Sequence, residues 1–228
     1  KTAYEIKECD WSSDVCSSDL ASQIESLLRS NDSLLQIQWD DLYNVNDGSI
    51  ETIKDADGIA GNNVTGRRSH YIVEERVADG KKLHINTTYN TEIGDNFQFT
   101  GGAGYMNQRT NYFKRVKDLL GGDFYVDLNQ YAEQDFADSL NFIQNDVNRP
   151  NRILHEGDKF GYDYDANITR MNAWGQGQWK FDKVDLFASL ELSNMSYFRT
   201  GNVKNGLFQD NSFGDSEKEQ FSNYAAKG

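Results

Sequence analysis

The sequence predicts an all-β fold built from long antiparallel strands. Of its 228 residues, 13% are aromatic and 19 are glycine, whereas only one is proline. Aromatic residues favour strands, glycine favours turns, and proline is excluded from sheet interiors. Two pairs of segments in which apolar and polar residues alternate give the second observation. The third is that no run of about 18 apolar residues exists, so we expect no transmembrane helix.

The first 20 residues are left out of the fold prediction. Asp10 to Leu20 back-translates, in one frame and without mismatch, into a strand of a common short-read sequencing adapter. Lys1 to Ile6 back-translates into the primer that adjoins this adapter. We therefore interpret residues 1–20 as translated adapter and residues 21–228 as the natural segment. We expect this segment to be an internal piece of a longer protein.

The natural segment is acidic and lacks cysteine. It contains 21 Lys and Arg against 31 Asp and Glu, and Cys9 and Cys16 both precede it. A nucleic-acid partner requires a concentrated basic face, so we expect none. A disulfide or thiolate metal site is excluded. The histidines lack the spacing of a metal site, so we predict neither metal nor cofactor; they are His70, His84 and His155.

The first part of the natural segment has the weakest pattern. We predict a short helix over Ala21 to Leu28 and a strand-like stretch from Leu34 to Tyr43. Asn44 to Arg68 is rich in glycine, asparagine and aspartate, which predicts a loop. Within it, Asp55 to Gly58 resembles the opening of a calcium loop but lacks the closing glutamate, so we interpret it as a polar turn.

The first clear hairpin joins Lys82 to Thr91 with Asn96 to Asn107 across the turn Glu92 to Asp95. Alternate residues of both strands are apolar or small, which places them on one face of a sheet. They are Leu83, Ile85, Thr87 and Tyr89 in the first strand, and Phe97, Phe99, Gly101, Ala103 and Tyr105 in the second.

The second hairpin runs from Phe160 to Lys180, turns at Phe181 to Lys183, and returns through Val184 to Arg199. In the outgoing strand the alternation breaks at Arg170 and Asn172, where we expect a bulge. The return strand has the clearest pattern. Its apolar stripe is Val184, Leu186, Ala188, Leu190 and Leu192, opposite Asp185, Phe187, Ser189, Glu191 and Ser193.

Alternation alone also fits the half-buried strands of a soluble sandwich. Strands approaching about 15 to 20 residues, however, far exceed the usual ~5 to 6 of globular sheets. The turns within each hairpin are short, whereas the connection Gln108 to Asp158 is long. This asymmetry is typical of outer-membrane barrels, with short periplasmic turns and long extracellular loops. We predict a partial antiparallel transmembrane β-barrel.

Several stretches resemble the barrel of TonB-dependent outer-membrane receptors of the Bacteroidota. They are Tyr112 to Phe136, Gln144 to Arg152, Glu156 to Tyr164, Glu191 to Phe208 and Phe221 to Gly228. The resemblance implies a plugged barrel of about 22 strands in a Gram-negative outer membrane. It would import a metal chelate or a glycan when TonB displaces the plug. The plug and the TonB box have no counterpart in this segment.

The resemblance also implies partners: the TonB complex, outer-membrane lipid, a small-molecule or glycan ligand, and a surface lipoprotein. Aromatic residues in the long connection are candidate ligand contacts, because flat rings suit sugar or chelate faces. The alternative is that they pack the loop on itself. They are Tyr112, Phe113, Phe124, Tyr125 and Tyr131.

Two other classes of protein fit the pattern less well. The first is a secreted β-sandwich that binds carbohydrate and closes its core within the segment. The second is a β-rich hydrolase, which would need a pair of carboxylates facing one cleft. No spacing singles out such a pair among 31 acidic residues, so we predict that the protein is not an enzyme.

Overall fold

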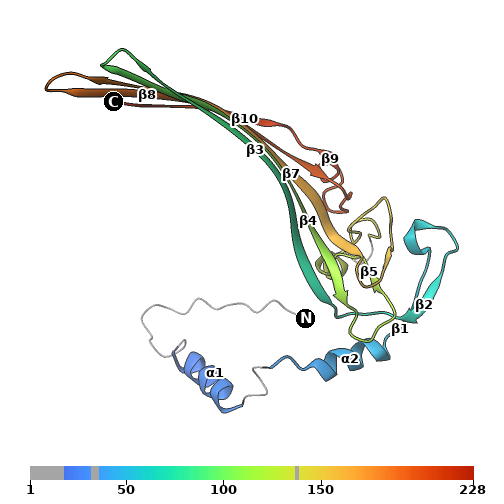
Figure 1. Cartoon of the computed structure of the whole chain (residues 1–228). Helices are drawn as coiled ribbons and strands as arrows, with labels where there is room; N and C mark the ends of the chain where they lie inside the picture. Colours follow the sequence, from blue (N-terminus) through green and yellow to red (C-terminus); the bar gives the residue numbers. More distant parts are fainter. Residues whose placement is uncertain (1–17, 32–35, 137–138) are drawn as a thin grey trace, which may run out of the picture. The chain divides into compact units, whose positions relative to one another are not determined.

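The computed structural model describes residues 18–31, 36–136 and 139–228. The chain forms two compact units, residues 1–44 and 45–228, which are described separately. Most of the described residues lie in strands of antiparallel sheets, which confirms the predicted all-β class (Figure 1). Among the described residues, no helix is both long and apolar enough to cross a membrane.

The two longest helices of the described residues lie near the start of the chain. The predicted first helix is confirmed but longer, since α1 spans Ser18–Ser30. The rest of the adapter-like stretch, residues 1–17, lies outside the described residues. The predicted strand from Leu34 to Tyr43 is wrong, because α2 spans Trp39–Gly48, and Leu34 and Leu35 lie outside the described residues. Acidic residues in the first turn of α2 favour a helix start through the helix dipole.

The predicted loop from Asn44 to Arg68 contains a small hairpin. Strand β1 (Ile50–Ile53) pairs antiparallel with β2 (Val64–Arg67). A 3₁₀ turn, η2 (Ala56–Gly58), lies between them, as the polar-turn interpretation expected. The loop prediction failed because four-residue strands are too short to show an alternation among so many turn-forming residues.

The large sheet contains both predicted hairpins. Its strands are β3 (Val73–Ile93), β4 (Phe97–Asp118), β7 (Lys159–Lys180), β8 (Asp185–Gly201) and β10 (Glu219–Lys227). The spatial order is β10-β8-β7-β4-β3, with β9 (Gly214–Asp215) paired to the end of β8. The first four strands are 17 to 22 residues long, and in Figure 1 they form one continuous curved ribbon.

The expected bulge near Arg170 is absent. Pairing of β4 with β7 runs without interruption from Phe97–Trp179 to Phe113–Asp163. Instead, Gly161 and Tyr162 form a two-residue insertion before Lys114–Phe160 resumes the ladder. The alternation in β7 breaks for another reason. Its apolar residues lie on one face of the sheet near the turns and on the other face near the long connection.

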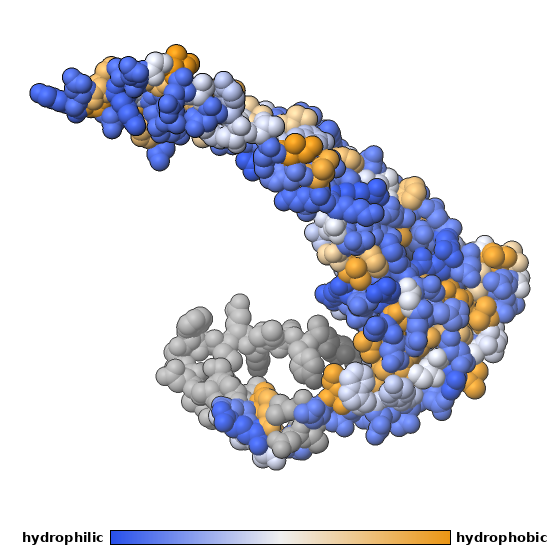
Figure 2. Space-filling view, viewed as in Figure 1, coloured by the Kyte–Doolittle hydropathy of each residue, from blue (hydrophilic) through white to orange (hydrophobic). Residues whose placement is uncertain are grey.

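The face of the sheet that bears Leu190 is here called the apolar face. Residues that pair with one another across neighbouring strands form a row. Successive apolar rows lie on this face, from Ile93, Phe97, Trp179 and Leu186 to Ile85, Tyr105 and Met171. Within residues 45–228 no described segment covers its large side chains, and Figure 2 shows hydrophobic side chains at the surface along the sheet. Exposed fractions range from 37% to 81% among Leu83, Ile85, Tyr89, Ile93, Met171, Trp179, Leu186, Leu190, Leu192 and Tyr224.

The opposite face is here called the polar face. Along the part of the strands that bears the apolar rows, this face has mainly polar side chains. It bears Asn86, Asn90, Thr100, Gln176, Gln178, Ser189, Glu191 and Ser193. Its apolar members at this level are fewer: Met106, Trp174, Phe187, Met195 and Phe221. The two faces therefore differ as the alternation predicted.

The buried core lies at the far end of the sheet from the hairpin turns. Residues 119–158, here called the loop unit, contain β5 (Tyr125–Val126), α3 (Gln130–Asp135) and β6 (Ile153–Leu154). One buried cluster joins this unit to the sheet through Val116 and Phe160, both on the polar face. The other cluster joins it to the β1–β2 hairpin through Ile53 and Val64. The loop unit therefore packs on the polar face.

Candidate functional site

Four tyrosines of the polar face, Tyr112, Tyr162, Tyr164 and Tyr197, lie beside the loop unit; we call them the tyrosine patch. The rings of Tyr112 and Tyr164 stack with centroids 5.3 Å apart, and those of Tyr162 and Tyr164 lie 5.9 Å apart. Burial raises the pKa of Tyr164, and the hydroxyls of the other three tyrosines raise it further. All four therefore belong to one cluster of phenols.

The sheet leaves space around these rings because their neighbours are small. Ala78 pairs with Tyr112 on one side, and Gly201 pairs with Tyr164 on the other. The next row toward the turns begins with Gly80, which has no side chain. Large residues at these positions would cover the edges of the rings. The tyrosine patch is thus a shallow aromatic floor of the kind that contacts flat ligands.

The insertion in β7 fixes one edge of the patch. Gly161 adopts φ 69°, a left-handed conformation that glycine tolerates best. Its backbone N–H donates to Asp127 Oδ1 at 2.9 Å. The buried Asp127 carboxylate also accepts from Asn145 at 2.9 Å and pairs with Arg152 at 3.2 Å. A buried carboxylate of the loop unit therefore holds the insertion and, with it, Tyr162.

A cavity of about 370 Å³ lies between the loop unit and the end of the sheet. Typical ligand pockets measure about 300–1,000 Å³. Gln130 donates to the Tyr125 hydroxyl at 3.4 Å on its wall. Burial raises the pKa of Tyr125 to about 12, so this hydroxyl stays neutral near pH 7. His70 and Tyr131 complete an aromatic and polar lining.

Lys114 connects the cavity with the tyrosine patch. Its Nζ lies 5.5 Å from the Phe160 ring centroid and 5.9 Å from that of Tyr162. It also pairs with Glu74 at 2.9 Å. Burial opposes ionisation of Glu74, but hydrogen bonds from Lys114 and Arg76 outweigh it and lower the pKa of the carboxyl group. The cavity and the patch therefore form one continuous surface with a charged centre.

The five predicted contact residues do not form one site. The prediction that Tyr112 and Phe113 lie in a loop is wrong, because both belong to β4 and face opposite sides of the sheet. Phe124 is 2% exposed in the loop core, as the packing alternative expected. Tyr125 and Tyr131 line the cavity. Sequence reasoning missed Tyr162, Tyr164 and Tyr197 as site residues. The available signal was that Tyr162 and Tyr164 are alternate residues of one predicted strand, and that Tyr197 lies in the strand predicted to pair with it.

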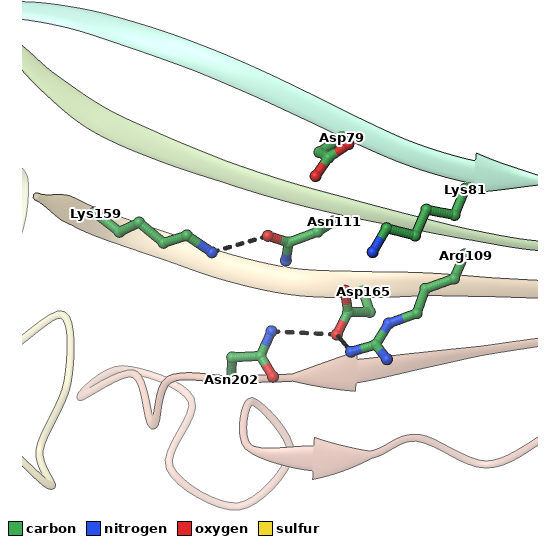
Figure 3. Close-up of a pocket in the computed structure, with 7 residues that line it drawn as sticks. All are labelled: Asp79, Lys81, Arg109, Asn111, Lys159, Asp165 and Asn202. Carbon is green, nitrogen blue, oxygen red and sulfur yellow. Dashed lines mark hydrogen bonds and ion pairs between the residues drawn. The ribbon is translucent and has the colours of Figure 1, made fainter. Parts of the chain in front are cut away.

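A second hollow, of about 340 Å³, lies on the apolar face just beyond the apolar rows (Figure 3). Asp165, which is 2% exposed, accepts from Arg109 at 2.7 Å, and this bond lowers the pKa of the carboxyl group. Asn202 also donates to Asp165, at 3.4 Å, and Lys159 donates to Asn111 at 2.9 Å. These bonds tie β4, β7 and the end of β8 together, so we interpret the hollow as a structural network.

Comparisons of the chain with protein-family models, with curated proteins and with solved structures give no match.

Proposed function

We propose that this segment is part of an outer-membrane β-barrel receptor that takes up a nutrient, either a metal chelate or a glycan. The observation that carries the proposal is the uncovered apolar face of the long antiparallel sheet. Soluble monomers rarely expose contiguous apolar patches larger than a few hundred Å². A lipid bilayer removes this cost because the same side chains then lie in hydrocarbon.

The dimensions of the apolar face support a membrane setting. In β3 the apolar side chains of this face extend from Leu83 to Ile93. At about 3.4 Å per residue this stretch is roughly 34 Å long, and a strand tilted by about 40° would span roughly 26 Å of height. The apolar band of outer-membrane barrels is about 25 Å tall. The first charged side chains on this face, Lys81 and Arg109, lie in the next row.

The polar face supports the same arrangement. In a barrel it would line the lumen, and the loop unit packed on its end would lie at the extracellular mouth. A ligand arriving from outside would then meet the cavity and the tyrosine patch first. Import would further require a plug and the TonB complex, and a surface lipoprotein would be a candidate partner, as the resemblance implies.

A secreted carbohydrate-binding sandwich is the second candidate. It would need another sheet packed on the apolar face. In the described part of the chain the other sheets are β1–β2 and β5–β6, and the buried core adjoins the polar face. This placement favours the barrel over the sandwich.

Tryptophan quenching in lipid vesicles tests the proposal. Trp179 lies on the apolar face and Trp174 on the polar face of the same strand. Two variants with a single tryptophan each would be compared. Both carry Trp11→Phe and Trp39→Phe; one also carries Trp174→Phe and keeps Trp179, and the other carries Trp179→Phe and keeps Trp174. Each would be refolded into phosphatidylcholine vesicles with brominated acyl chains.

We expect the bromines to quench Trp179 strongly and Trp174 weakly. Equal quenching of the two would contradict a lipid-facing apolar face. A cooperatively melting monomer that stays in solution without lipid or detergent would contradict the proposal as well, because unclosed strands with exposed edges are expected to aggregate.

A further inference from the structure

The charges around the tyrosine patch specify the kind of ligand, given the proposed function. The whole chain has a net charge of −13, yet the polar face beside the loop unit is basic. Between the Glu74 and Arg170 rows, strands β3, β4, β7 and β8 bear five cations and one carboxylate, Glu74, on this face, and β10 adds Glu219. The cations are Arg76, Lys82, Lys114, Arg170 and Arg199; Glu191 lies two rows beyond Arg170, toward the turns, and pairs with it at 3.6 Å.

Not all of these cations are neutralised by neighbours. Glu74 pairs with both Arg76, at 2.7 Å, and Lys114, at 2.9 Å, so one carboxylate serves two cations. Among the described residues, Lys82 and Arg199 have no carboxylate partner. Arg199 donates to the Asn211 carbonyl and stands one row from Tyr164, while Lys82 shares a row with Tyr197. The patch therefore has unmatched positive charge on both sides.

We infer that the ligand is anionic and has flat faces, and that it is an oligosaccharide containing uronic acids. Pyranose rings present apolar C–H faces that stack on tyrosine rings. Their carboxylates would pair with Lys82, with Arg199 and, beside the loop unit, with Lys114 through charge-assisted hydrogen bonds. The cations lie on four strands, β3, β4, β7 and β8, and not at a single point, which suits an extended chain with repeated carboxylates. A net positive patch on an acidic protein also attracts anions selectively.

Calorimetric titration of the vesicle-reconstituted chain tests this inference. The probes are a tetramer of galacturonic acid, the neutral galactose tetramer and a ferric catecholate, which is the other flat anion that suits the patch. We expect the acidic tetramer to bind, the neutral one to bind at least tenfold more weakly, and affinity to fall as salt is raised.

Matched variants locate the site. Lys82→Gln and Arg199→Gln should each weaken binding of the acidic tetramer about tenfold, and Tyr197→Ala should weaken it several-fold. Lys81→Gln is the control, because Lys81 neighbours Lys82 on the same strand but faces the opposite side. We expect Lys81→Gln to leave affinity unchanged. Circular dichroism of each variant verifies that the sheet is intact.

Four outcomes would overturn the inference: no binding of the acidic tetramer, equal binding of the neutral tetramer, equal effects of the Lys81 and Lys82 variants, or binding of the catecholate alone. The last outcome would still indicate an anion-binding site but would rule out an oligosaccharide as its ligand. Bromolipid quenching of Trp179 in the same vesicles separates these failures from failure of the proposed function, since lipid contact does not depend on the ligand.

Discussion

Leu190→Arg is the substitution that most directly probes the apolar face. Leu190 is 50% exposed and pairs with Gly175 on β7 and Ala226 on β10. Its row is the third of the five that run from Leu186 to Asn194 on β8. The side chain would thus lie near the bilayer midplane, where arginine is least tolerated.

The expected cost follows from this depth. An arginine on the lipid face of a barrel destabilises it by about 2–4 kcal/mol at the midplane. This corresponds to a rise of roughly 30-fold to nearly a thousandfold in the unfolding equilibrium constant. Ser189→Arg is the matched control, because Ser189 is the adjacent residue and lies on the polar face opposite Gln176. We expect it to change stability by less than about 1 kcal/mol, since that face is hydrated.

Urea unfolding of the chain in phosphatidylcholine vesicles, followed by tryptophan fluorescence, measures both variants. We expect Leu190→Arg to lower the urea concentration at the unfolding midpoint and Ser189→Arg to leave it unchanged. Equal shifts for the two variants would refute the assignment of faces. A large effect of Leu190→Arg that persists in a lipid-free, soluble chain would refute the membrane setting and indicate a protein partner for this face.

Two further predictions concern the loop end of the sheet. Asn46 is fully buried and hydrogen-bonds the backbone of His70, Tyr71, Leu119 and Leu120. In urea titrations, Asn46→Ala should therefore lower the free energy of unfolding by about 3 kcal/mol or more. Asn44 is exposed, so the control Asn44→Ala should change it by less than about 0.5 kcal/mol. In the same titration, Gly161→Ala should lower the free energy of unfolding by about 1–2 kcal/mol, because the backbone there has a left-handed φ of 69°. The control Gly80→Ala, whose added Cβ would make only an ordinary contact with Thr110, should leave it nearly unchanged. Equal losses of stability would contradict the assignment of backbone strain to Gly161.

The hairpins were predictable because strand alternation is a local signal. Leu186 to Leu192 and Phe97 to Tyr105 show it within a few residues, and the short turns fix the pairing register. The extension of β3 back to Val73 was not predictable, because its charged residues do not alternate in hydropathy. Pairs such as Glu75 with Arg115 support that part of the ladder, and such partners lie 40 residues apart.

The sequence by itself determined the all-β class, both long hairpins and the division into an apolar and a polar face, since each depends on residues close in the chain. Only the tertiary structure decided which aromatic residues share a surface. Tyr112, Tyr162, Tyr164 and Tyr197 come from three strands, and their contact depends on cross-strand register and on the insertion at Gly161. The same register separated Tyr112 from Phe113, because consecutive residues of a strand point to opposite faces.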